Sequence, residues 1–448
     1  MLIQVIKQIK NFWQRQRNTQ LAQEGFWSLV LRVAYVAIAF ITTIILARSL
    51  GAENYGIYAY AYALAMLLVI PIYTGLPNLV LRETAKGLAQ DQPGLVKGAW
   101  WWAGGASIIF SLLIFSIVGP ILVAWQGGLT SPTGQAMAYA LLLAPILALG
   151  NIVGAALRGM RYIVIGQLSE FIIRPLLFLA FIIFFIYVYH ERFSASKALV
   201  LYIFAASIAF AIGMRMLLRR TPTSVRSASP IVKSHKWLVS AALFALIAGF
   251  GAINDQASTV ILGYYKTPDQ VGLYRVAIQV ARLASFGLQV ANMVAAPRFA
   301  KLYALGEVGR IQKLATSIAR VSLFSNLLFT IFFIFLGKTF FNVVFGFEFS
   351  ASYWPLLILL IGQLVNSAVG SVGYLLNMTG HEKETVWGMA AAAGLNILLG
   401  LVLVPPFGIM GAAASVALSM VFWNIYLWWR VCKIIRVNSF ILNRVNGC

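Results

Sequence analysis

Charged residues are scarce in this sequence, and so are the residues that build most catalytic and metal sites. Only 10% of the 448 residues are charged, while 61% are apolar. A soluble protein of this composition would have too few polar side chains to cover its surface, so a soluble fold is excluded. The two cysteines, Cys432 and Cys448, lie near the C-terminus and form neither a disulfide framework nor a metal-site spacing.

Acidic residues are also few, 12 against 34 Lys and Arg, which gives a formal net charge of +22. Nucleic-acid binding would need this excess as a basic stripe on a folded soluble face. Here the basic residues lie mainly between long apolar runs, so the excess indicates membrane topology and no nucleic-acid partner is expected. The first 24 residues lack the short apolar core and cleavage site of a signal peptide.

Apolar runs longer than about 18 residues recur along the whole chain, which is typical of membrane helices. The sequence therefore predicts an all-α integral membrane protein with twelve spans. These cover residues 26–47, 55–80, 98–124, 135–157, 163–189, 198–218, 238–265, 270–296, 317–337, 352–378, 385–404 and 408–429. The longest polar connection divides them into two six-helix lobes. We predict an N-lobe at 25–220, a linker at 221–236 and a C-lobe at 237–430.

The ends of the chain and the connections between spans indicate the orientation. Residues 1–24 have apolar side chains on one helical face and basic ones elsewhere, which predicts a helix lying in the cytoplasmic interface. If the N-terminus is cytoplasmic, the outer loops contain few of the basic residues: Arg48, Arg192, Lys197, Lys266 and Lys338. This bias predicts that the N-terminus and the tail at 431–448 are both cytoplasmic.

The two halves of the sequence resemble each other. A shift of 216 residues aligns, among others, Glu53 with Asp269, Gly56 with Gly272, Tyr58 with Tyr274 and Arg82 with Arg298. Because six spans separate the copies, both run in the same direction across the membrane. The two lobes are therefore predicted to be related by a pseudo-two-fold axis along the membrane normal.

The hairpin at residues 250–292 places charges where a bilayer would be. Arg275, Arg282 and Gln289 recur every seven residues, with Gln279 and Asn292 close by, so they would form one polar stripe along a helix. A charge at membrane depth costs roughly 3 kcal/mol, and such residues usually face a cavity or a partner. This pattern predicts the lining of an anion path. Alternatively, Arg282 forms a structural salt bridge and Arg275 snorkels to the headgroups.

Two carboxylates lie at membrane depth. Asp255 either neutralises Arg275 or Arg282, or binds H⁺ or Na⁺ in exchange for substrate, because an unpaired desolvated carboxylate has a raised pKa. Glu170 precedes Arg174 by four residues, the favourable order for a helical ion pair. We expect these two to neutralise each other, with substrate binding or proton coupling as the alternative.

Two stretches identify a family resemblance. IILARSLGAENYGIYAYAYALAMLL followed by GLPNLVLRETAK, and INDQASTVILGYYKTPDQVGLYRVA in the second half, resemble the lipid-linked oligosaccharide and polysaccharide flippases. That family, which includes the O-antigen flippases, belongs to the multidrug/oligosaccharidyl-lipid/polysaccharide exporter superfamily. The resemblance implies twelve helices around a central cavity, and alternating access that moves an undecaprenyl-pyrophosphate-linked glycan outward. It also implies that basic cavity residues hold the pyrophosphate, a role carried to Arg275, Arg282 and Arg32, although Arg32 is shallow enough to snorkel.

The resemblance further implies a non-enzymatic transporter of a bacterial inner membrane in lipopolysaccharide or other polysaccharide biosynthesis. Its partners would be the lipid-linked glycan, the bilayer, and the glycan polymerase and glycosyltransferases of the same pathway. No cofactor is expected, apart from H⁺ or Na⁺ as a coupling ion. A multidrug or other lipid exporter is the first alternative. A membrane glycan polymerase, ligase or glycosyltransferase is the second, although the outer loops offer only His190, Glu191 and Glu348, with no paired acid–base arrangement.

Overall fold

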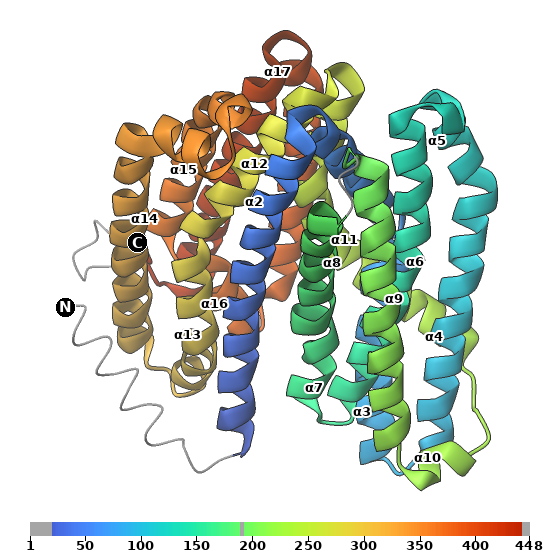
Figure 1. Cartoon of the computed structure of the whole chain (residues 1–448). Helices are drawn as coiled ribbons and strands as arrows, with labels where there is room; N and C mark the ends of the chain where they lie inside the picture. Colours follow the sequence, from blue (N-terminus) through green and yellow to red (C-terminus); the bar gives the residue numbers. More distant parts are fainter. Residues whose placement is uncertain (1–19, 189–191, 441–448) are drawn as a thin grey trace. The chain divides into compact units, whose positions relative to one another are not determined.

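The structure, a computed structural model, describes residues 20–188 and 192–440, and every regular element within them is helical (Figure 1). The elements before the linker are α2 (Gln20–Leu68), η1 (Pro71–Gly75), α3 (Leu76–Ala89), α4 (Pro93–Leu113), η2 (Ile114–Val118), α5 (Gly119–Trp125), η3 (Gly128–Thr130), α6 (Pro132–Gly159), α7 (Ile163–Leu168), η4 (Ser169–Ile173), α8 (Arg174–Val188) and α9 (Ala195–Arg220). They are followed by α10 (Thr223–Ser227), α11 (Ser234–Tyr265), α12 (Pro268–Ala284), α13 (Phe286–Ala304), α14 (Val308–Val344), η5 (Phe347–Ser352), α15 (Tyr353–Val369), α16 (Val372–Met378) and α17 (Glu382–Ile435). The predicted interfacial helix lies almost wholly outside the described residues.

Nine helical segments in the described part of the chain are long and apolar enough to cross a membrane. The chain is therefore a multi-pass, all-α integral membrane protein, as the sequence predicts. The segments are fewer than the predicted spans partly because α17 contains two of these spans, and α2 contains one span and the beginning of the next. The number of twelve spans stays a prediction.

A glycine divides each of these two long helices. At about 1.5 Å per residue, a straight helix of the 54 residues of α17 would be far longer than a bilayer is thick. Gly408 interrupts it with φ 54° and ψ −126°, and Gly51 interrupts α2 with φ 72° and ψ 173°. Residues with a side chain rarely adopt a positive φ, so glycine permits the chain to change direction there.

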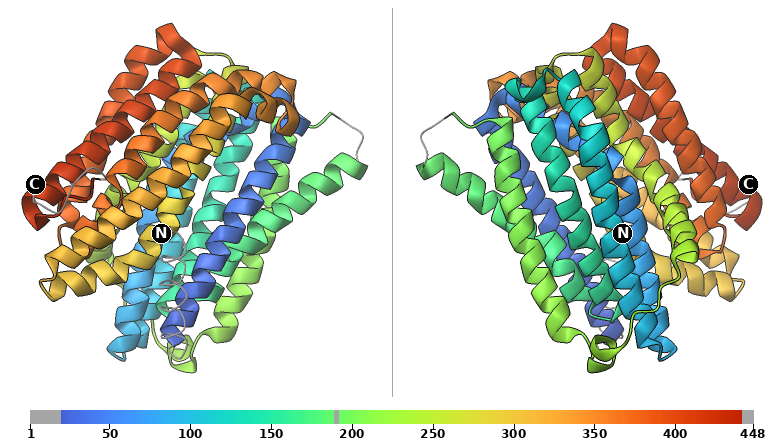
Figure 2. Two further views of the ribbon diagram at one scale, coloured as in Figure 1. Left: turned by 90° about the vertical axis from the view of Figure 1, so that its left-hand side faces the viewer. Right: turned by 90° about the vertical axis from the view of Figure 1, so that its right-hand side faces the viewer.

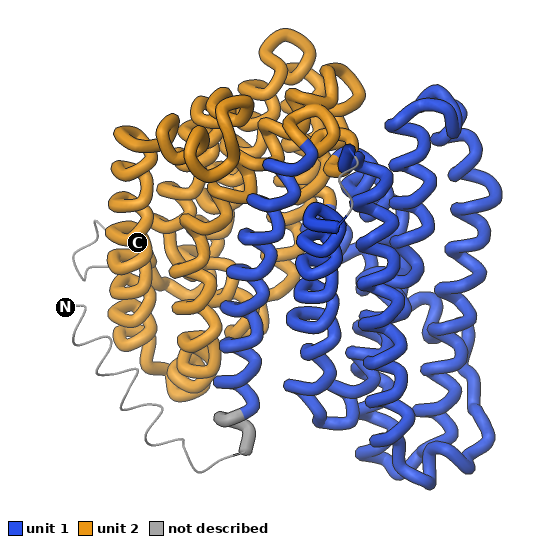
Figure 3. Tube along the Cα trace, in the orientation of Figure 1, with its two compact units in different colours: residues 1–50, 60–252 blue, residues 51–59, 253–448 orange. Residues whose placement is uncertain are grey.

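The chain forms two compact units (Figure 3). Unit 1 comprises residues 1–50 and 60–252, and unit 2 comprises residues 51–59 and 253–448. The boundaries fall inside α2 and α11, whereas the predicted lobes meet at the polar linker. The two divisions are thus different, and the predicted lobes stay a prediction.

Each unit has its own buried helix. In unit 1, α6 packs against α3, α4 and α9, which run side by side with it in Figure 2. Ala136, Ala140 and Ala144 have no exposed surface, and their small side chains at four-residue spacing let neighbouring helices approach closely. In unit 2, α12 occupies the corresponding role and packs against α15 and α17.

Two glycines that the internal repeat aligns meet in unit 2. A Cβ on Gly56 would lie 1.7 Å from the carbonyl oxygen of Pro268, and one on Gly272 would lie 2.1 Å from that of Ala52. The same 216-residue shift relates Pro268 to Ala52. The contact is therefore reciprocal, as it is for equivalent residues around a two-fold axis. Only glycine fits at either position.

The predicted linker is held against α4. The Nζ of Lys97 donates hydrogen bonds to the carbonyl oxygens of Arg226 at 2.7 Å and Ala228 at 2.9 Å. The backbone N–H of Ile231 donates to the carbonyl oxygen of Gly94 at 2.9 Å. Part of the linker forms the short helix α10. The polar composition of the linker thus predicted an exposed connection correctly. It did not predict the hydrogen bonds between the linker and α4.

Candidate functional site

The candidate site of unit 2 is built on α12. Pro268 and Asp269 begin this helix, and both residue types are favourable in a first turn. Every residue of α12 is buried or half-buried, and Val271, Val276 and Val280 have no exposed surface. A charged side chain on α12 must therefore find polar partners within its surroundings or lie at a gap in the packing.

Arg275 has found polar partners. Its residue is 7% exposed, and its Nη1 donates hydrogen bonds to Oε1 of Gln256 at 3.0 Å and to Oγ1 of Thr259 at 3.5 Å, both on α11. These contacts orient the guanidinium without cancelling its charge. The side chain is directed to a neighbouring helix, so the snorkelling alternative is wrong for this structure.

Arg282 lies at a gap in the packing. Its Nη2 is 3.2 Å from Oδ1 of Asp255 on α11, yet the two side chains are 39% and 62% exposed. Between residues 248 and 263 of α11, Asp255 is the one exposed residue. The ion pair that the sequence offered as one interpretation is thus formed, but its two charges remain accessible from one side.

The helix that is predicted to carry the polar stripe is divided at Ser285, and the stripe itself stays a prediction. The hydroxyl of Ser285 donates to the carbonyl oxygen of Arg282 at 3.0 Å, and this local hydrogen bond competes with the regular helical pattern. Arg275, Gln279 and Arg282 therefore lie on α12, whereas Gln289 and Asn292 lie on α13.

The two α13 residues differ from each other. Gln289 is exposed, and its Nε2 donates to Oγ of Ser285 at 3.2 Å. Asn292 is buried, and within the described residues its Oδ1 has no hydrogen-bond partner. Gln279 is half-buried, one turn from Arg275 and one turn from Arg282.

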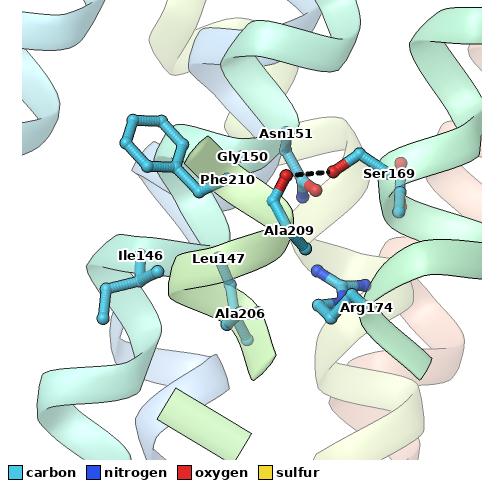
Figure 4. Close-up of a pocket in the computed structure, with 10 residues that line it drawn as sticks. Ile146, Leu147, Gly150, Asn151, Ser169, Arg174, Ala206, Ala209 and Phe210 are labelled. Carbon is cyan, nitrogen blue, oxygen red and sulfur yellow. Dashed lines mark hydrogen bonds between the residues drawn. The ribbon is translucent and has the colours of Figure 1, made fainter. Parts of the chain in front are cut away.

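A second group of charges lies in unit 1, around a pocket of about 240 Å³ (Figure 4). The pocket is lined by α6, η4, α8 and α9, through Ile146, Leu147, Gly150, Asn151, Ser169, Glu170, Arg174, Ala206, Ala209 and Phe210. Figure 4 shows the guanidinium of Arg174 beside Ala209 and Asn151, and the hydroxyl of Ser169 donating to the carbonyl oxygen of Ala209 at 2.7 Å. Arg174 itself is 8% exposed.

The expected ion pair between Glu170 and Arg174 is not formed in the described part of the chain. Oε2 of Glu170 lies 3.6 Å from Nη1 of Arg158 on α6 instead. The physical reason is local. Residues Ser169–Ile173 form a π-helical turn, in which side chains four positions apart no longer lie directly above each other.

Arg32 is exposed on α2, and its guanidinium lies over the ring of Phe171 at 5.8 Å from the centroid. It belongs to unit 1, together with Glu170 and Arg174, whereas Asp255, Arg275 and Arg282 belong to unit 2. The sequence-predicted residues are therefore divided between the two units.

Sequence reasoning missed three partners. Gln256 and Thr259 hold Arg275, and Arg158 holds Glu170. Gln256 and Thr259 are three residues apart, so they share one face of α11, and this spacing was the available signal. Arg158 gave no such signal, because it follows the predicted span at 135–157 and its contact with Glu170 depends on the packing of α6 against η4.

These helices define a multi-pass, all-α membrane protein. Residues 21–303, more than half of the chain, match the family described as "Polysaccharide biosynthesis protein", and the chain belongs to this family. A distant relative is the probable low-salt glycan biosynthesis flippase Agl15 of Haloferax volcanii. It is 22% identical over 404 residues, covering 89% of this chain and 81% of the relative.

Solved structures share the fold. An inward-facing multidrug resistance MATE family transporter of the MOP superfamily aligns with a TM-score of 0.74 at 12% identity, over 90% of this chain and 97% of that one. The lipid II flippase MurJ in an inward closed conformation aligns with a TM-score of 0.72 at 10% identity, over 91% and 87%. At such identities the likeness concerns the fold alone.

Proposed function

We propose that this protein is a flippase that moves a polyprenyl-pyrophosphate-linked oligosaccharide from the cytoplasmic to the outer leaflet. Family membership and the distant glycan flippase support the substrate class. The observation that carries the proposal is the accessible ion pair of Arg282 and Asp255. O-antigen or another polysaccharide repeat unit is the proposed cargo, with glycosyltransferases supplying it and a polymerase receiving it.

The exposed residues of unit 2 distinguish a lipid-facing surface from a polar one. Between residues 324 and 336 of α14 most exposed side chains are large and apolar, for example Leu328, Phe332 and Phe335, as expected against lipid. In the middle of α11 the exposed residue is a carboxylate, and it contacts an arginine. Because exposing charges to hydrocarbon is costly, we assign this part of α11 and α12 to a hydrated substrate path.

The ion pair provides the binding step of this proposal. A guanidinium offers a planar fork of donors that matches a phosphate, and it stays charged at any physiological pH. In our proposal the pyrophosphate replaces Asp255 as the partner of Arg282, and Asp255 takes Arg282 back when the cargo leaves. Arg275, held by Gln256 and Thr259, adds a fixed positive charge one heptad away.

We infer a twelve-helix arrangement in two lobes with alternating access. The reciprocal contact of Gly56 with Gly272 supports the pseudo-two-fold relation between the halves of the sequence. The bias of basic residues supports cytoplasmic termini in a bacterial inner membrane. The central cavity, the tail at 431–448 and the direction of transport are part of this proposal.

The coupling ion is a separate part of the proposal. The 3.2 Å contact of Asp255 with Arg282 favours an ion-pair role. Coupling to H⁺ or Na⁺ would act while the cargo occupies Arg282 and Asp255 is released. Glu170 is the corresponding candidate in unit 1.

Two other functions are less well supported. A multidrug exporter shares the fold, but cationic drugs favour acidic or aromatic cavity groups over paired arginines. For a glycan polymerase or ligase, His190 and Glu191 lie outside the described residues. Glu348 instead accepts a hydrogen bond from the N–H of Ala52 at 3.1 Å, where it caps the helix that follows Gly51.

The proposal is tested by replacing Arg282 in cells that depend on this protein for surface glycan. Arg282→Gln should lower export by on the order of 100-fold, because a charge-assisted phosphate contact is lost. Lipid-linked glycan should accumulate on the cytoplasmic side while the amount of protein in the membrane stays unchanged. Arg310→Gln is the matched control, since Arg310 is exposed and pairs only locally with Glu307 at 2.9 Å. Normal export by Arg282→Gln would remove Arg282 from the mechanism.

A further inference from the structure

Arg174 is a buried cation for which the described residues provide no acceptor. Its residue is 8% exposed, and its Nε is buried without a hydrogen-bond partner. Among the described residues no carboxylate lies within ion-pair distance of its guanidinium, because Glu170 is engaged by Arg158. Burying an unpaired charge costs several kcal/mol. The buried guanidinium of Arg174 is therefore expected to bind a ligand or to have another function.

The charges around the pocket do not cancel. Glu170 and Arg158 form one neutral pair, with side chains 24% and 23% exposed, and Arg174 remains as one positive charge. Tyr35, Tyr73 and Tyr202 are the other titratable groups that interact with Arg174. None of the three is a carboxylate, so they do not compensate the charge of Arg174. The cluster therefore has a net charge of one.

The pocket has walls of both kinds. Its volume of about 240 Å³ includes space open to solvent, so the room beside Arg174 is small. Ile146, Leu147, Ala206, Ala209 and Phe210 form the apolar part of the wall. A single small ion with few bound water molecules suits such a space better than a phosphate with its tightly held water.

The polar groups beside Arg174 are already oriented. Ser169 donates to Ala209, and Nδ2 of Asn151 makes a long hydrogen bond of 3.4 Å to the carbonyl oxygen of Tyr73. Oδ1 of Asn151 has no partner within the described residues. The guanidinium of Arg174 is therefore the main donor that the pocket offers to a ligand (Figure 4).

We propose that this pocket is a binding site for one monovalent inorganic anion, chloride under cellular conditions, held by Arg174. One such ion neutralises the cluster and satisfies the guanidinium. The pyrophosphate of a lipid-linked glycan carries more charge and is attached to a sugar and a lipid, so it does not fit a space of this size. The site lies within unit 1 and is independent of the proposed function of Arg282.

The experiment uses the purified full-length protein in lipid nanodiscs. Its Tm is measured in sodium chloride and in sodium gluconate at constant ionic strength. Binding to the native state should raise Tm by about 3 °C and the rise should saturate with chloride concentration. Arg174→Gln should abolish the rise, and Arg282→Gln should keep it even though that variant loses export. In crystals grown with sodium bromide, an anomalous peak should lie within hydrogen-bond distance of Arg174.

Glu170→Gln gives a second test with the opposite sign. Removing the negative charge beside the pocket should lower the chloride concentration at half-saturation by roughly tenfold. This variant and the bromide peak keep the proposal testable if Arg174→Gln does not fold.

Three results would overturn the site. The first is a Tm of the wild-type protein that does not respond to chloride. The second is an equal rise in Arg174→Gln, which would mean an adventitious ion only. The third is an equal rise with sodium phosphate, which would assign the pocket to the phosphate of the cargo. None of these results would affect the proposed flippase role of Arg282.

Discussion

Arg282 and Arg174 show two opposite ways of placing an arginine in a membrane protein. Arg282 has a carboxylate partner at 3.2 Å, and yet its side chain is 39% exposed. Arg174 is 8% exposed and has no acceptor among the described residues. The first arrangement permits exchange, because a ligand can reach the guanidinium and displace Asp255. The second permits only a small ligand that is already enclosed, so burial and pairing together indicate what each arginine can bind.

The largest expected effect comes from exchanging the two charges of unit 2. The double variant Asp255→Arg with Arg282→Asp retains an ion pair but moves the guanidinium from α12 to α11. We expect export to fall by on the order of 100-fold, because the phosphate contact needs the guanidinium on α12 beside Arg275. Surface glycan and lipid-linked intermediates measure export, and membrane fractions measure the amount of protein.

The control for this exchange is the exposed local pair Glu307 and Arg310. The variant Glu307→Arg with Arg310→Glu should export normally. If the exchanged pair of unit 2 also exported normally while each single variant failed, the pair would have a structural role only, and the comparison of Arg282 with Arg174 would lose its functional meaning.

Most of the fold could be predicted from the pattern of apolar residues. A helix in lipid must satisfy its own backbone, so long apolar runs leave little choice of structure. The repeat that aligns Gly56 with Gly272 even indicated two residues that are now found in contact. The limits of long helices could not be predicted, because Gly51 and Gly408 interrupt α2 and α17 through their backbone conformation and not through polarity.

The candidate site was less predictable than the fold. The contact of Asp255 with Arg282 followed from opposite charges on adjacent spans. The pairing of Glu170 with Arg158 did not, because the π-helical turn at Ser169–Ile173 changes which side chains meet. The exposure of the two arginines was not predictable either. Arg174 and Arg282 both lie in apolar helical stretches of the sequence, and only tertiary packing makes one buried and the other accessible.

An intermediate effect is expected for stability when Arg174 is made apolar. In sodium gluconate, Arg174→Met should raise the free energy of unfolding by about 1–3 kcal/mol, because replacing an unpaired buried charge by an apolar side chain removes its desolvation cost. Thermal unfolding in nanodiscs measures this change. A matched substitution, Arg282→Met, should not stabilise the protein. Destabilisation by Arg174→Met in gluconate would show that Arg174 has a protein partner that supports the fold.

A smaller effect on stability is expected for Asp255→Asn. Its side chain is 62% exposed, so losing the ion pair with Arg282 should change the free energy of unfolding by less than ~1 kcal/mol. Export at low cargo concentration should rise by about twofold to fivefold, because the carboxylate no longer competes for Arg282. The dependence of export on pH and on sodium separates the two roles. If it becomes flat, Asp255 couples an ion; if it is unchanged, Asp255 is an ion-pair partner only.

The smallest effect is expected for Gln289→Ala, which tests where the polar path of α12 ends. Gln289 is exposed on α13, beyond the interruption at Ser285, and its side chain donates to that serine at 3.2 Å. Gln289 lies on a different helix from the two arginines of α12. Export by the variant should therefore stay within about twofold of the wild type, and its free energy of unfolding within about 0.5 kcal/mol. Gln279→Ala is the matched comparison, because Gln279 lies between Arg275 and Arg282 on α12 and its loss should reduce export more. Equal losses for the two glutamines would mean that the path continues past Ser285, and the site would then extend along both helices as the heptad spacing alone suggests.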